Sequence, residues 1–152
     1  MHDRRRELLK AAGALAVFLA AGLLKPLSAL AAWNKEAFGA KSLPDALRSL
    51  GAANPADSKD IVIEAPQIAE NGAVVPIEIT SNLPNTKSIT VLIEKNPFPL
   101  TGHFEFKEGA VPFVKINVKM GESSNVRVVA EAGGKFFAAV KEIKVTIGGC
   151  GG

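Results

Sequence analysis

From Ile61 onward, apolar and polar residues alternate along the chain with a period of two. This alternation is typical of half-buried strands, because successive side chains of a strand point to opposite faces. Turn residues, among them Asn71-Gly72, Asn96-Pro97 and Gly133-Gly134, separate the runs. About seven short strands at regular spacing predict an all-β protein, an immunoglobulin-like antiparallel β-sandwich over residues 61–147. The predicted strands are Ile61–Ile63, Val75–Ile79, Ile89–Ile93, His103–Lys107, Val114–Val118, Val126–Ala130 and Lys135–Ile147.

Two pairs of aromatic residues on these strands allow predictions about faces. Phe104 and Phe106 lie two residues apart, so they should share one face of their strand. Phe136 and Phe137 are adjacent, so one ring should lie in the core and the other outside it.

The only helical pattern after residue 31 lies within Trp33–Ala53. Ser42 is a candidate N-cap, with Pro44 early in the helix and Asp45 in its first turn. Residues 54–60 follow as a polar linker, so we predict a helical preface and linker over 32–60. The apolar residues at helical spacing, which we expect to dock on a sheet, are Leu43, Leu47 and Leu50.

Residues 1–31 have the pattern of an export signal. Basic residues precede Ala11–Leu24, an apolar run of fourteen residues that suits a signal better than a membrane span. Small residues at 29–31 fit a signal peptidase site and predict a mature start at residue 32. Arg5-Arg6, with Lys10 after a leucine pair, is similar to a twin-arginine signal, so we expect export in the folded state. An uncleaved anchor is the competing interpretation.

Removal of this signal would change the charge of the chain. The full chain has 18 Lys and Arg against 15 Asp and Glu, a formal net charge of +3. Residues 1–31 hold five of the basic and two of the acidic residues, which leaves 13 of each sign, since 18 − 5 = 13 and 15 − 2 = 13. A neutral mature chain without a basic cluster lacks the electrostatic signature of nucleic-acid binding. After cleavage we expect no membrane association either.

The mature sequence offers no candidate catalytic residue, metal ligand set or cofactor motif. Its one histidine, His103, is remote in sequence from its one cysteine, Cys150. A lone histidine on a strand is more often a surface or hydrogen-bonded residue than a ligand. The sequence also shows no Ser-His-Asp pattern, phosphate loop or paired-carboxylate motif. We therefore expect neither a metal nor a cofactor.

The informative residues are the last five. Cys150 is flanked by Gly148, Gly149, Gly151 and Gly152, which predict a flexible arm over 148–152. A tail without side chains around the thiol is thin enough to enter a narrow channel of another protein. The tail contains no Lys, Arg or His that could stabilise the thiolate. Cys150 therefore has the character of an attachment point rather than a self-activated nucleophile. An accidental unpaired cysteine, or one that forms an intermolecular disulfide, is the alternative.

The segment Val145–Gly152 resembles the C-terminus of the SoxY family, the sulfur-carrier subunits of the periplasmic Sox thiosulfate-oxidation system. Together with the twin-arginine-like signal, the resemblance covers essentially the whole chain. Asn117 departs from it, at a position where Arg is expected. The other segments that resemble the family are Ala69–Pro76, Glu94–Leu100, Phe104, Lys119-Met120 and Val126-Arg127.

The resemblance implies that Cys150 carries covalent sulfur intermediates, an S-thiosulfonate and then a persulfide. It implies a heterodimer with a SoxZ-like subunit, a c-type cytochrome that loads thiosulfate, a dimanganese thiosulfohydrolase that releases sulfate, and in some organisms a sulfane dehydrogenase. It also implies a periplasmic location and a carrier that is not itself an enzyme.

Two other functions remain open from the residues alone. The first is a ubiquitin-like carrier that uses the carboxylate of Gly152 as a thiocarboxylate, although its activation needs ATP, which an exported protein lacks. The second is an exported structural or adhesion sandwich that dimerises through Cys150. The position of a sulfur label, on the thiol or on the carboxyl group, separates the first of these from the thiol carrier.

Overall fold

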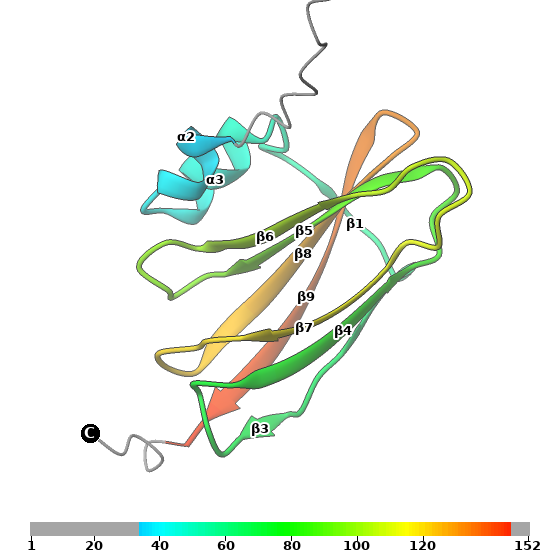
Figure 1. Ribbon diagram of the computed structural model, residues 1–152. Coiled ribbons are helices and arrows are strands. Elements are labelled where there is room, and N and C mark those ends of the chain that lie inside the picture. Colours follow the sequence, from blue (N-terminus) through cyan, green and yellow to red (C-terminus); the bar gives the residue numbers. More distant parts are fainter. Residues whose placement is uncertain (1–33, 147–152) are drawn as a thin grey trace, which may run out of the picture. The chain divides into compact units, whose positions relative to one another are not determined.

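A computed structural model describes residues 34–146 of the protein. Within this range the chain forms two short helices and two β-sheets (Figure 1). The larger sheet has the strand order β1-β9-β8-β5-β6, with β3 also paired to β9, and the smaller sheet has the order β2-β4-β7. The strands of the larger sheet are β1 (Ala56–Asp57), β3 (Ile68–Ala69), β5 (Thr86–Ile93), β6 (Leu100–Glu105), β8 (Ser124–Ala132) and β9 (Lys135–Val145). Those of the smaller sheet are β2 (Ile61–Glu64), β4 (Val75–Ser81) and β7 (Phe113–Val118).

The predicted β-sandwich is confirmed. The principal strands pair antiparallel within each sheet, and their alternating apolar residues meet in one core between the sheets. On β4 the buried residues are every second one, as the period-two pattern requires. The largest fully buried side chains of this core are Ile77, Ile79, Ile89, Ile93 and Ile143.

Two helices cover the outer face of the larger sheet (Figure 1). They are α2 (Lys35–Gly39) and α3 (Leu43–Ser49). The Oγ of Ser42 accepts a hydrogen bond from Asp45 N at 3.3 Å, so the predicted N-cap of α3 is confirmed. The predicted docking is confirmed too, since the leucines of this region pack on the sheet. This second core contains Leu47, Leu92, Leu100, Val129 and Ala138, with Leu43, Leu50 and Phe136 packed against it.

The helix layer corrects the prediction for the aromatic pair on β9. Phe137 packs against the core between the sheets, as expected. Phe136 does not lie outside a core, because it packs against the cluster beneath the helices. For the same reason Leu92, on the other face of β5 from the sandwich core, is buried. The helices thus bury a face that an isolated sandwich would leave in water.

Three predicted segments differ in detail. β6 begins at Leu100 and ends at Glu105, three residues earlier than expected at its start, although Phe104 and Phe106 both pack on the sandwich core. The segment 54–60 is more than a linker, because β1 pairs with β9 in parallel, as the two-residue β3 also does. β9 ends at Val145, and Thr146 lies beyond the strand.

Candidate functional site

The residues predicted to carry function lie outside the described part of the chain: Cys150, Gly148, Gly149, Gly151 and Gly152 of the arm, and Arg5 and Arg6 of the signal. What the structure describes is the place from which the arm begins. We call Val145 and Thr146 the arm root, because Val145 ends β9 and Thr146 is the last described residue before the arm.

On one side, the segment containing β3 holds the arm root. Ala69 pairs with Val145 in a parallel register. Thr146 N donates a hydrogen bond to the carbonyl oxygen of Ala69 at 3.1 Å. The Thr146 hydroxyl donates to the carbonyl oxygen of Glu70 at 3.4 Å. Both the backbone and the side chain of Thr146 are therefore bonded to residues about 76 positions earlier in the chain.

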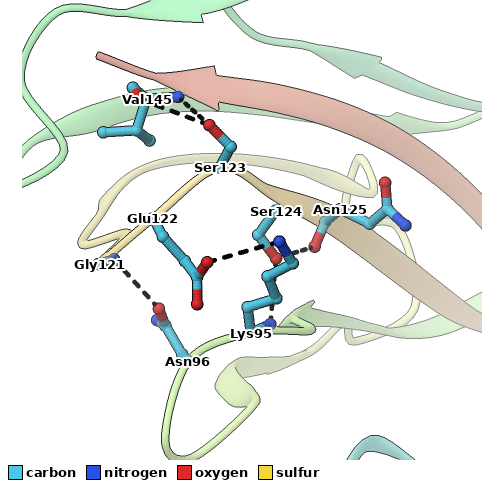
Figure 2. A network of polar contacts seen from close by, with 8 residues as sticks. All are labelled: Lys95, Asn96, Gly121, Glu122, Ser123, Ser124, Asn125 and Val145. Carbon is cyan, nitrogen blue, oxygen red and sulfur yellow. Dashed lines mark hydrogen bonds and ion pairs between the residues drawn. The ribbon is translucent and has the colours of Figure 1, made fainter. Parts of the chain in front are cut away.

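On the other side, Ser123 holds Val145 (Figure 2). The Val145 N–H donates to Ser123 Oγ at 2.9 Å, and the Ser123 hydroxyl donates to the Val145 carbonyl oxygen at 3.4 Å. One side chain thus satisfies both backbone groups of the last residue of β9. Each such bond contributes on the order of 1 kcal/mol.

Gly72 lies close to the same residue. A Cβ at position 72 would lie 2.4 Å from the Met120 carbonyl oxygen and 2.8 Å from Val145 Cγ1. The backbones also meet here, since Met120 N donates to the carbonyl oxygen of Gly72 at 2.7 Å. Only glycine fits between Met120 and the arm root without displacing one of them.

The turn between β5 and β6 supports the turn that carries Ser123 (Figure 2). Asn96 donates from Nδ2 to the Lys119 carbonyl oxygen at 2.8 Å and accepts from Gly121 N at 3.4 Å. The backbone N–H of Lys95 donates to Ser124 Oγ at 3.1 Å. Lys95 Nζ also lies 3.5 Å from Glu122 Oε2, an exposed ion pair that contributes little by itself.

A half-buried ion pair joins Glu94, directly after β5, to Arg127 on β8. Glu94 Oε1 accepts from Arg127 Nε at 3.0 Å and lies 2.9 Å from Arg127 Nη2. Its other oxygen accepts from Asn125 Nδ2 at 3.1 Å. Because the side chains of both ions are about a quarter exposed or less (26% and 22%), this pair is better shielded from water than the other ion pairs between described residues.

The turns around the arm root are therefore hydrogen-bonded to one another as well as to β9.

A family model described as sulfur oxidation protein SoxY matches residues 47–150. The chain belongs to the SoxY family. The structure of the sulfur carrier protein SoxY from Chlorobium limicola f thiosulfatophilum is 36% identical in sequence, with a TM-score of 0.64. That similarity covers 70% of this chain and 97% of the Chlorobium chain.

A second structural likeness concerns the fold alone. Superoxide reductase (neelaredoxin) from Ignicoccus hospitalis has a TM-score of 0.51 at 23% identity, over 57% of this chain and 80% of that one. The comparison with curated proteins finds no match. Within residues 34–146 the SoxY-family chain has no group of three or more His, Cys, Asp or Glu that could hold a metal ion. In the same range, no helix is long and apolar enough to cross a membrane.

Three of the segments that resemble the SoxY family, residues 69–76, 94–100 and 119–120, meet at or beside the arm root, whereas Phe104 packs on the sandwich core. Residues 69–72 contact Val145 and Thr146 directly, and residues 119–120 close over Gly72. Residues 94–96 bond to residues 119–125. Ser123 does not belong to any of these segments, and no motif in the sequence predicts its role. Only its position two residues after Gly121, in a turn, could have suggested a side chain free to bond a neighbouring strand.

His103 lies apart from this region, as a hydrogen-bonded residue of the larger sheet. Its Nδ1 is 2.8 Å from the hydroxyl of Thr90 on β5, and its Nε2 is 3.9 Å from Glu105 Oε1. Of the two environments expected for His103, a surface position or a hydrogen-bonded one, the structure shows the hydrogen bond to Thr90.

Proposed function

We propose that the protein is a covalent sulfur carrier in thiosulfate oxidation, with Cys150 as the attachment point. The observation that carries the proposal is membership of the SoxY family, with a match that extends to residue 150 and so includes the only cysteine. The solved relative from Chlorobium is itself a sulfur carrier protein. The firmly held arm root supports the same function, because a carrier arm needs a fixed point of attachment.

The position of the arm root limits how far the thiol can travel. Cys150 is four residues beyond Thr146, and an extended chain spans at most about 3.6 Å per residue, so the reach is at most about 14 Å. Enzymes that act on Cys150 must therefore bring their active sites to the protein. The protein supplies a sulfur atom and an arm, and its partners supply the catalysis.

The proposed chemistry has two steps on Cys150. In the first, the thiolate and thiosulfate form a sulfur–sulfur bond, R–S⁻ + ⁻S–SO₃⁻ → R–S–S–SO₃⁻ + 2 e⁻, and a c-type cytochrome accepts the two electrons. In the second, water attacks the sulfonate sulfur, R–S–S–SO₃⁻ + H₂O → R–S–S⁻ + SO₄²⁻ + 2 H⁺. A dimanganese thiosulfohydrolase catalyses this hydrolysis, which leaves a persulfide on Cys150. A sulfane dehydrogenase then oxidises the persulfide sulfur, or another acceptor takes it.

The remaining partners and the location belong to the same proposal. A SoxZ-like subunit forms a heterodimer with the chain. Export through the twin-arginine route, directed by Arg5 and Arg6, takes the folded protein to the periplasm. Folded export would allow a subunit without its own signal to cross with it.

Intact mass measurement after incubation with thiosulfate and the loading cytochrome tests the proposal. We expect an adduct on the wild-type chain, removed by reductant, and none on Cys150→Ser. A matched control moves the thiol: Cys150→Ser combined with Val111→Cys places an exposed cysteine on the loop between β6 and β7, where Val111 is 75% exposed. This variant should react with a small thiol reagent but should not be loaded by the cytochrome.

Two results would refute the proposal. An adduct that persists on Cys150→Ser would exclude the thiol, and a sulfur label on the Gly152 carboxyl group would favour the thiocarboxylate carrier. Equal loading of the relocated thiol would show that the arm has no role in presentation.

A further inference from the structure

Three turns gather at the end of the sandwich from which the arm begins. They are residues 70–74 before β4, residues 94–99 between β5 and β6, and residues 119–123 between β7 and β8. Strand direction places them there, because β8 starts and β9 ends at this edge, and Ser124 pairs with Ile143. The hydrogen bonds of Asn96, Ser123 and Gly72 join the turns to one another and to the arm root. We call these three turns the root face.

The reach of the arm determines which surface an enzyme must approach. The reach of about 14 Å is an upper limit, and any depth to which Cys150 enters a channel is subtracted from it. The opposite end of β9, near Lys135, is ten residues away, or about 33 Å at 3.3 Å per residue. An enzyme that receives the thiol in a channel must therefore bring the mouth of that channel close to the root face and not to the opposite end.

The root face presents an apolar residue in a fixed position. Phe98 is 51% exposed, although a large aromatic side chain gains from burial. It lies between Pro97 and Pro99, which restrict the backbone, and Pro99 is fully buried. The Pro99 carbonyl oxygen accepts from Ile93 N at 2.8 Å, which holds the turn against β5. Because the turn is already ordered, contact with Phe98 costs little conformational entropy.

Other groups of the root face suit an interface as well. Val74, in the turn next to Gly72, is 55% exposed. The exposed ion pair of Lys95 and Glu122, which joins two of the three turns, provides a polar rim of both signs. An exposed aromatic residue with a polar surround is the usual composition of the energetically important part of a protein interface.

We propose that the root face is the docking surface for the enzymes that act on Cys150, with Phe98 as its principal apolar contact. The occupant is a sulfur-processing enzyme whose active site lies at the end of a narrow channel with an apolar rim at its mouth. The inference rests on the proposed function, since it requires that an enzyme receives the arm. Docking on the root face and insertion of the arm then act together, because the root face and the arm root belong to one hydrogen-bonded unit.

The test measures hydrolysis of the Cys150 S-thiosulfonate by the purified thiosulfohydrolase, as a function of the concentration of the carrier with its subunit. Phe98→Ser should raise KM about tenfold, the effect of losing one strong interface contact, with kcat at saturation unchanged. The matched control is Val111→Ser, an exposed valine at the opposite end, which should leave KM at the wild-type value. Val74→Ser is a second variant on the root face and should raise KM to a smaller extent.

Each alternative outcome is distinguishable. Equal KM values for Phe98→Ser and Val111→Ser would overturn the proposal, as would a fall in kcat alone. If Phe98→Ser instead weakens association with the SoxZ-like subunit, the root face is a subunit interface and the proposal is wrong. Failure of the proposed function would appear earlier, as absence of any adduct on wild-type Cys150. The reaction of Cys150 with a small thiol reagent should be normal in Phe98→Ser, Val74→Ser and Val111→Ser alike.

Discussion

Gly72→Ala is the substitution most directly predicted to disturb the arm root. The new Cβ would lie 2.4 Å from the Met120 carbonyl oxygen, which belongs to the backbone and cannot rotate away. It would also lie 2.8 Å from Val145 Cγ1, so the last residue of β9 would be pushed as well. The backbones must separate, and the hydrogen bond from Met120 N to the Gly72 carbonyl oxygen, 2.7 Å long, would lengthen.

The size of the effect follows from these contacts. Insertion of a methyl group into a packed site costs about 1–3 kcal/mol, and loss of one backbone hydrogen bond costs about 1 kcal/mol. Partial relaxation relieves some of both, so we expect the free energy of unfolding to fall by about 2–3 kcal/mol. For a domain of this size Tm should fall by about 10 °C.

Thermal and chemical unfolding of the purified protein measure this loss. Gly121→Ala is the matched control, because Gly121 lies in the neighbouring turn and a Cβ there meets nothing within 4 Å. That variant should differ from the wild type by less than about 0.5 kcal/mol. If Gly72→Ala proves as stable as Gly121→Ala, the close approach of residue 72 to Met120 does not constrain the fold, and our account of the arm root is wrong.

Two further predictions concern polar contacts of the described residues. Ser123→Ala should speed hydrogen exchange of the Val145 amide about tenfold, because that N–H loses its acceptor at 2.9 Å, whereas Ser123→Thr should keep the protection. Unchanged exchange in Ser123→Ala would contradict this role. The hydrogen bond and charge of Glu78, 2.6 Å from Lys115 Nζ, raise the pKa of Lys115 above its usual 10.5. The contribution of the Lys115–Glu78 pair to the free energy of unfolding is therefore fully present below pH 10.5 and lost as the pH rises through the raised pKa of Lys115. Measured as a function of pH, the unfolding free energy of Glu78→Gln should lack this decrease.

The sandwich could be predicted from the sequence because its strands follow local rules. Alternation along β4, β7 and β8 determines which residues face the core, and these residues are buried as expected except Ile116, which is partly buried against it. The cap of α3 is equally local, since Ser42 bonds Asp45 three residues later. Where the alternation is weak, as at Leu100-Thr101-Gly102, the pattern does not mark the start of β6, which lies three residues before the predicted one.

The contacts of the arm root could not be predicted in the same way, because they join residues far apart in the chain. Asn71-Gly72 indicated a turn, which is correct, but the need for glycine comes from Met120 and Val145. Ser123 bonds Val145 across 22 residues, and the nearby Gly121 indicates a turn but not this partner. The partial burial of Phe136 depends on helices about ninety to a hundred residues earlier. In each case the tertiary packing, and not the local pattern, determines the environment.

The firm arm root has a consequence for how the arm and the root face cooperate. If Val145 and Thr146 detached, the free segment up to and including Cys150 would grow from four residues to six, and the effective concentration of the thiol at a docked active site would fall only about twofold. Arm length alone therefore gives little reason to hold the root by Ser123, Ala69 and Glu70. The larger gain is geometric: with the root attached to the turn that Asn96 supports, contact at Phe98 places the start of the arm at a fixed position relative to the channel. A residue that holds the root should then affect processing by an enzyme more than the reaction with a small thiol reagent.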